Sequence, residues 1–197
     1  MTIVLFVEGK TETALREHLK SFLDRCAAAE GRPKVALRTK PLMTTDAREL
    51  AKCVRLELAG PSVSHVVGLV DVYPCFSSAE EAKRFQREAA GDNPQFTAHA
   101  AQYEVEAWVL PYWDDVCRKL KVKRAAPGPC PEHVDLDNPP SRRLAELYRT
   151  AGKRTYRKAI EMAAILRGKD LTIAAEQCPE FKSFLNTLLK LGGLRPL

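Results

Sequence analysis

The chain has 197 residues and a mass of 22.0 kDa, which is enough for one domain that builds its core without disulfides. Its hydrophobic fraction of 45% and charged fraction of 28% are those of an ordinary globular protein. No apolar run reaches the roughly 20 residues of a membrane-spanning helix. The six cysteines contain no Cys-x-x-Cys pair, and residues 1–7 lack the basic segment of a signal peptide. We therefore expect a cytoplasmic protein with no membrane association.

The net charge of +6 is unevenly distributed along the chain. Residues 118–169 contain 14 Lys and Arg against 5 Asp and Glu, whereas residues 1–117 contain 14 against 17. A basic excess in one segment is typical of a surface that binds polyanions, and equally of a solvated helical face.

The first half of the chain alternates between strand and helix patterns. Apolar, β-branched segments predict four strands, at residues 2–7, 35–39, 65–70 and 95–103. Helical patterns lie between them and begin at Thr11, at Asp46, and at Ser77 or Ser78. This alternation predicts an α/β fold with a mainly parallel four-stranded sheet flanked by helices, and it leaves the order of the strands open.

The second half reads as a helical extension. Residues 104–120 predict a helix that is kinked or broken near Pro111, and the proline-rich residues 125–140 predict a connector without regular structure. Further helices are expected at residues 141–150, 156–166 and 180–191. Their apolar positions are too few for a separate large core. We therefore expect an α/β domain over residues 1–110 and a basic helical extension over residues 111–197 packed on it.

Acidic residues stand where three of the four predicted strands end. Glu8 follows the first strand, Asp71 ends the third, Glu104 and Glu106 follow the fourth, and Glu12 lies one helical turn beyond Glu8. The carboxyl ends of parallel strands form the usual ligand site of an open sheet. Clustered carboxylates need a cation, and oxygen ligands favour Mg²⁺ or Mn²⁺. Taken one at a time, each acid is also explained as a turn or helix-cap residue.

The same residues resemble a known family. Residues 7–12 (VEGKTE) and 69–74 (LVDVYP) resemble the Toprim domain of topoisomerases, bacterial primases and the overcoming-lysogenization-defect (OLD) nucleases. The Glu-Gly-x-Thr-Glu form looks most like the OLD-type nucleases, in which both glutamates are metal ligands. With residues 103–107 (YEVEA), 140–143 (PSRR) and 178–181 (CPEF), the sequence is similar to a family of small prokaryotic Toprim-like proteins of unknown function.

This resemblance implies a Toprim-like fold, Mg²⁺-dependent phosphodiester chemistry and an ATPase partner in a phage-defence system. The sequence departs from it at Tyr73, since the Toprim motif Asp-x-Asp reads Asp71-Val72-Tyr73 here. Tyrosine does not replace a carboxylate ligand at neutral pH, so Glu104 or Glu106 is expected to supply the missing oxygen. Both face one side if the strand continues through them, and only one points inward if the chain turns helical.

The leading hypothesis is a metal-dependent nuclease in which Glu8, Asp71 and Glu104 carry the chemistry, with Glu12 and Glu106 as further metal ligands. Basic side chains are expected to bind phosphate or the nucleic-acid backbone: Lys10, Arg142, Arg143, Lys153 and Arg154. The alternative is a catalytically inactive regulatory or scaffold subunit that binds an ATPase partner or nucleic acid. Tyr73 favours the alternative, and the retained acids favour the nuclease.

Overall fold

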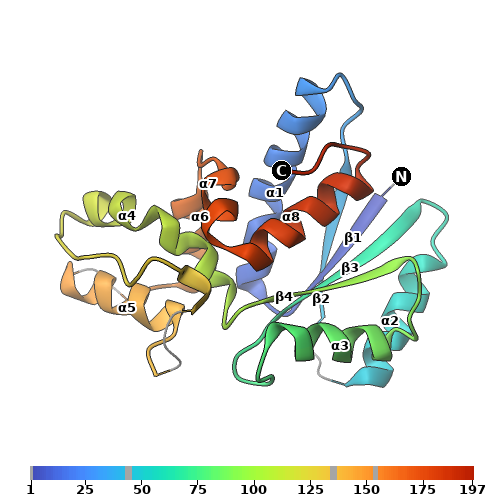
Figure 1. Cartoon of the computed structure of the whole chain (residues 1–197), viewed down its shortest axis with the longest axis horizontal. Helices are drawn as coiled ribbons and strands as arrows, with labels where there is room; N and C mark the ends of the chain where they lie inside the picture. The colour runs from blue at the N-terminus through green and yellow to red at the C-terminus, as the bar shows by residue number, and fades with distance from the viewer. Residues whose placement is uncertain (1, 43–45, 134–136, 153–154) are drawn as a thin grey trace.

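The first half of the chain forms one parallel sheet with helices on both faces (Figure 1). The computed structural model describes residues 2–42, 46–133, 137–152 and 155–197, and the side chains of residues 10–13 lie outside the description. The strands are β1 (Thr2–Val7), β2 (Ala36–Pro41), β3 (Val63–Asp71) and β4 (Phe96–Ala101), and their order across the sheet is β2-β1-β3-β4. The predicted four-stranded parallel α/β sheet is confirmed.

Helices cover both faces of this sheet because β1 is apolar on both. Ile3, Leu5 and Val7 pack on the side of α1 (Lys10–Ala29) and α8 (Pro179–Leu191), while Val4 and Phe6 pack on the opposite face. Helices α2 (Ala47–Leu58) and α3 (Ala79–Ala89) lie together on this second face (Figure 1).

Two predicted helix caps are confirmed. The Asp46 side chain accepts a hydrogen bond from the Arg48 N–H at 2.8 Å, and the Ser78 hydroxyl accepts one from the Glu81 N–H at 3.1 Å. Of the two candidates for the start of α3, Ser78 is therefore the cap. Each cap satisfies a backbone donor that the first helical turn leaves open.

The second half of the chain differs in part from the prediction. The expected helix over residues 104–120 is a 3-10 helix, η1 (Val105–Tyr112), followed by α4 (Trp113–Leu120), and Pro111 lies just before the change. The connector contains a short 3-10 helix, η2 (Pro131–His133). The remaining helices are α5 (Pro140–Thr150), α6 (Lys158–Leu166) and α7 (Leu171–Gln177). Helix α7, capped by Asp170, was not predicted because it is short and largely apolar.

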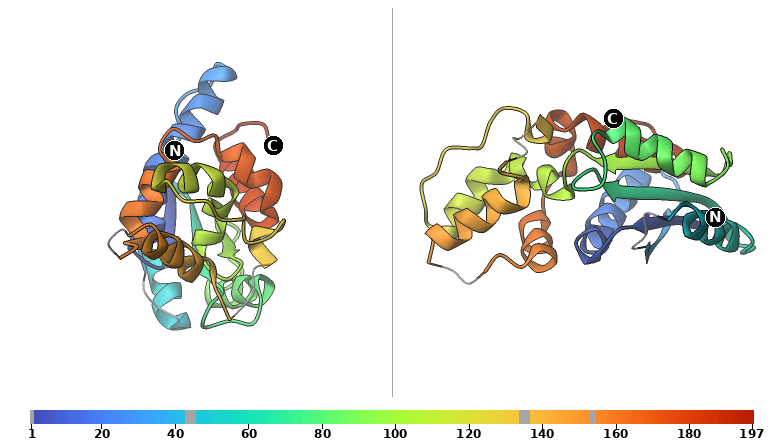
Figure 2. Two further views of the ribbon diagram at one scale, coloured as in Figure 1. Left: turned by 90° about the vertical axis from the view of Figure 1, so that its left-hand side faces the viewer. Right: turned by 90° about the horizontal axis from the view of Figure 1, so that it is seen from below.

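One buried cluster joins both halves of the chain. It contains Ile3 and Leu5 of the sheet together with Trp108, Phe181 and Phe184. The Trp108 ring stacks on Phe181 with ring centroids 4.5 Å apart. Helices α4 and α5 form a lobe beside the sheet (Figure 2). None of the helices in the described ranges is long and apolar enough to cross a membrane.

A buried histidine of this core is expected to make stability depend on pH. Burial and the Lys83 ammonium lower the pKa of His99 to about 4. The unfolded chain, with a histidine pKa near 6.5, binds one more proton between these values. The free energy of unfolding should therefore fall by about 3 kcal/mol as pH drops through this window. Urea denaturation across the window measures the fall, and a His99→Gln variant with an unchanged pH dependence would contradict it.

Candidate active site at the carboxyl ends of the strands

Two acids meet where the adjacent strands β1 and β3 end. Glu8 follows Val7, which is paired with Leu69 in the parallel register, and Asp71 is the last residue of β3. Glu8 Oε2 accepts a hydrogen bond from the Asp71 backbone N–H at 3.1 Å. The two predicted residues, 63 positions apart in sequence, are thus brought together by the parallel pairing.

The side chain of Asp71 fixes the segment that follows β4. Asp71 Oδ1 accepts a hydrogen bond from the Val105 N–H at 2.9 Å. Val105 is the first residue of η1, where backbone N–H groups lack partners within the helix. The chain reaches this point through Tyr103, whose φ of 64° lies in the left-handed region. Asp71 therefore holds the start of η1, which carries Glu106 and is preceded by Glu104.

Glu104 and Glu106 both reach the same cation. The Lys158 ammonium of α6 lies 2.9 Å from Glu104 Oε1 and 3.4 Å from Glu106 Oε1. The side chains of the two acids are 7% and 1% exposed, so this cation compensates carboxylates that water hardly reaches. The expectation that a helical turn sends one of the pair outward is wrong. Glu104 precedes the helix in an extended conformation, and Glu106 lies in its first turn.

The acids around Lys158 keep it charged. Burial alone lowers the pKa of the Lys158 ammonium, but the carboxylates of Glu106, Glu104 and Asp71 outweigh it and raise that pKa above its usual value. Asp71 and Lys158 therefore belong to one electrostatic site. Sequence reasoning missed Lys158, which stands 54 residues after Glu104 in a helix assigned to the basic extension.

Ser141 ties the helical extension to this site. Glu104 Oε2 accepts a hydrogen bond from the Ser141 N–H at 2.9 Å, and Oε1 accepts one from the Ser141 hydroxyl at 2.8 Å. Ser141 lies in the first turn of α5, where the helix dipole favours a negative charge. The serine of the PSRR motif thus donates hydrogen bonds to one of the acids at the strand ends.

The two predicted arginines of that motif hold the turn before α5. Arg142 donates from Nη1 to the Asp137 carbonyl at 2.9 Å, and Arg143 donates from Nε to the Asn138 carbonyl at 3.0 Å. Arg142 is exposed and Arg143 is half-buried. The other predicted groups lie outside the described residues. They are the side chains of Lys10 and Glu12 and the residues Lys153 and Arg154.

The acids fit a Mg²⁺ ion in part. Within the described ranges, no group of three or more His, Cys, Asp or Glu side chains is arranged to hold a metal ion. Both oxygens of Glu104 accept hydrogen bonds, and Glu106 faces Lys158. Glu8 and Asp71 each accept a backbone hydrogen bond through one carboxylate oxygen, at the ends of adjacent strands, and are the pair that would hold the ion. Mg²⁺ is commonly held by one or two carboxylates together with waters and substrate phosphates, so this pair suits it.

Comparisons with known proteins agree with the fold. No curated protein matches the chain. The solved C-terminal region of the Burkholderia pseudomallei OLD protein is similar with a TM-score of 0.52 and 14% identity, and the similarity covers 96% of this chain and 98% of that one. At this identity the likeness concerns the fold. The family described as "Domain of unknown function (DUF4276)" matches residues 7–189. Because this match covers nearly all 197 residues, the chain belongs to the DUF4276 family.

Proposed function

We propose that the protein is a Mg²⁺-dependent nuclease that hydrolyses phosphodiester bonds of nucleic acid. The observation that carries the proposal is the hydrogen bond from the Asp71 backbone N–H to the Glu8 carboxylate, which places Glu8 beside Asp71 at the carboxyl ends of β1 and β3. The resemblance of their motifs to Toprim domains, and the likeness of the fold to the C-terminal region of an OLD protein, support it. By the same resemblance, the proposal includes an ATPase partner and a role in phage defence.

The residues of the site have separable roles in this proposal. Glu8 and Asp71 would hold the ion, which when bound lowers the pKa of a water molecule and stabilises charge on the phosphate. The Asp71 N–H orients Glu8, and the Val105 N–H orients Asp71. Lys158, 46% exposed and protonated, would contact a phosphate oxygen from the solvent side. Glu104 and Glu106 position Lys158.

The first test is cleavage by the purified protein. Supercoiled plasmid, single-stranded DNA and RNA are incubated in Mg²⁺, Mn²⁺ or EDTA with wild type, Glu8→Ala and Glu88→Ala. Glu88 is a matched control because its side chain is 70% exposed on α3. We expect cleavage that needs metal, disappears in Glu8→Ala and persists in Glu88→Ala. Cleavage in EDTA, or an active Glu8→Ala variant, would overturn the proposed site.

A second candidate function is a regulatory or scaffold subunit without catalysis. The specific observation in its favour is the Lys158 ammonium, which already compensates Glu104 and Glu106. The exposed Tyr73 at the second motif position adds to it. In this case the protein would bind nucleic acid or an ATPase through its basic segment, with neither cleavage nor measurable Mn²⁺ binding.

A further inference from the structure

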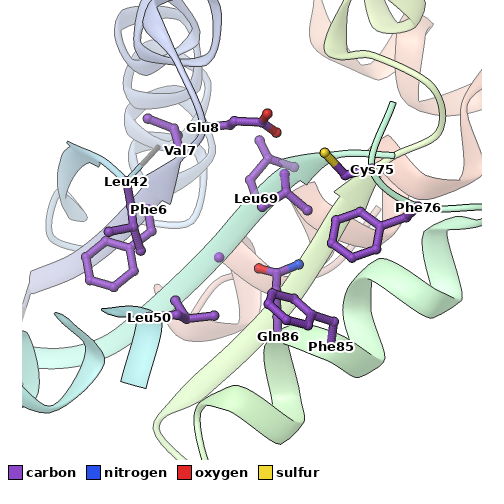
Figure 3. Close-up of a pocket in the computed structure, with 12 residues that line it drawn as sticks. Phe6, Val7, Glu8, Leu42, Leu50, Leu69, Cys75, Phe76, Phe85 and Gln86 are labelled. Atoms are coloured by element: carbon purple, nitrogen blue, oxygen red, sulfur yellow. The ribbon is translucent and has the colours of Figure 1, made fainter. Parts of the chain in front are cut away.

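A cavity of about 230 Å³ opens beside Glu8 on the sheet face that carries α2 and α3 (Figure 3). It is smaller than the roughly 300–1,000 Å³ of pockets that take drug-sized ligands, so its size suits a single ring system. Its walls are mostly apolar and aromatic, formed by Phe6, Leu42, Leu50, Leu69, Phe76 and Phe85. The rings of Phe76 and Phe85 are in contact, with centroids 5.5 Å apart.

One buried amide gives this cavity a directional polar group. Gln86 is 1% exposed, and its Nε2 donates to the His99 carbonyl at 2.9 Å and to the Ala82 carbonyl at 3.3 Å. Two carbonyl partners fix which way the amide faces, so its oxygen is turned to Gly68. A Cβ added at Gly68 would lie 2.2 Å from Gln86 Oε1. The glycine therefore makes room for a hydrogen-bond acceptor in the cavity wall.

These features select a class of ligand. Apolar walls that include three phenylalanine rings, together with one fixed acceptor, suit a heteroaromatic ring that carries an N–H donor, whereas an aliphatic group would leave that acceptor unmatched. Glu8 lines the same cavity and contacts Asp71, so a group attached to the ring would extend toward the candidate active site.

We propose that this cavity takes one unpaired nucleobase of a nucleic-acid strand. The base donates an N–H to Gln86 Oε1, and its ring lies against the phenylalanines, with the adjoining phosphate directed to the sheet edge where Glu8 would hold the ion. A paired base keeps its donors in the duplex, so the strand must be single or the base turned out of the stack. The identity of the ligand as nucleic acid rests on the proposed nuclease function. The presence of the cavity and its preference for a ring with an N–H donor do not depend on that function.

The test uses Cys75, an exposed thiol that lines the cavity, as a reporter. Its alkylation by iodoacetamide is followed by mass spectrometry in EDTA, where no cleavage is needed, with half-buried Cys130 as the internal reference. The probes are a single-stranded DNA decamer, adenosine 5′-monophosphate and ribose 5-phosphate. We expect the decamer to slow Cys75 alkylation at least about five-fold and ribose 5-phosphate to have no effect.

Three results would overturn the base site. They are no protection by the decamer, equal protection by ribose 5-phosphate, and protection by the mononucleotide alone, which would assign the cavity to a free nucleotide. A metal-dependent nuclease without Cys75 protection would keep the proposed function and remove this site. Protection of Cys75 in a protein that never cleaves nucleic acid would keep this binding site and remove the proposed nuclease function.

Two variants at the reporter position check the cavity without altering the core. Cys75→Trp narrows the cavity from an exposed position, and Cys75→Ser keeps its size. Binding of the labelled decamer in EDTA is measured by fluorescence anisotropy. Cys75→Trp should bind the decamer at least about five-fold more weakly than Cys75→Ser, because only the tryptophan narrows the cavity. Equal affinity of the two variants would contradict the proposal.

Discussion

Replacing Asp71 by Asn is expected to lower the rate of nucleic-acid cleavage by about 10²–10³-fold with little loss of stability. The amide keeps an oxygen that accepts the Val105 N–H, so the start of η1 stays in place. What it loses is the negative charge. That charge would hold a Mg²⁺ ion in the proposed mechanism, and it also raises the pKa of Lys158. The substitution should therefore lower the cleavage rate far more than the free energy of unfolding.

Single-turnover cleavage and urea denaturation of the same preparations separate these two effects. Asp92→Asn is the matched control, because Asp92 is exposed and its φ of 49° is a conformation that asparagine adopts readily. Its cleavage rate should equal that of wild type. An Asp71→Asn variant that cleaves at a rate close to wild type would remove Asp71 from the catalytic site.

Removing the Lys158 ammonium is expected to destabilise the protein by about 2–3 kcal/mol at neutral pH. Lys158→Met keeps the length of the side chain and leaves the buried Glu104 and Glu106 carboxylates without their cation. The expected loss is below that of a fully buried pair, because Lys158 is 46% exposed and solvent screens it. Cleavage should fall as well, since the variant cannot contact the phosphate.

The pH dependence of this loss has a definite sign. Folding raises the pKa of Lys158, so in wild type its contribution persists through neutral pH and is lost only as the pH rises through that raised value. Lys158→Met lacks this contribution, so the gap to wild type should persist through neutral pH and close as the pH rises through the raised pKa of Lys158. Urea denaturation across this range measures it, with exposed Lys52→Met as the control. Equal stability of Lys158→Met and wild type at neutral pH would contradict the role of Lys158.

The sheet was predictable because its signals are local. The apolar run of β1 marks a strand buried on both faces, and Asp46 and Ser78 mark the starts of α2 and α3 with side chains that cap them. The acids at the strand ends followed from the same pattern, since parallel strands present their carboxyl ends at one edge. Glu8 and Asp71 were therefore predictable at one edge of the sheet, but their contact was not, because it depends on β1 and β3 being adjacent and the sequence left the strand order open.

The other side of the site was not predictable, because it depends on how the helical extension folds back. Ser141 and Lys158 reach Glu104 from α5 and α6, and no spacing in the sequence relates them to the end of β4. For this reason Glu104 and Glu106 were interpreted as metal ligands alone, without the cation that the structure gives them. The hydrogen bond that fixes the start of η1 after β4 was not predictable for the same reason, because its acceptor, Asp71, lies on another strand.

A Mn²⁺ titration followed by electron paramagnetic resonance tests the central claim most directly, because it asks whether the strand-end acids hold a metal before any substrate is chosen. Wild type, Glu8→Gln, Asp71→Asn and the Asp92→Asn control are titrated at one ionic strength. We predict Mn²⁺ binding by wild type and by Asp92→Asn, and affinity at least about ten-fold weaker in the other two variants. No binding by wild type, or equal binding by all four proteins, would contradict a metal-dependent nuclease centred on Glu8 and Asp71.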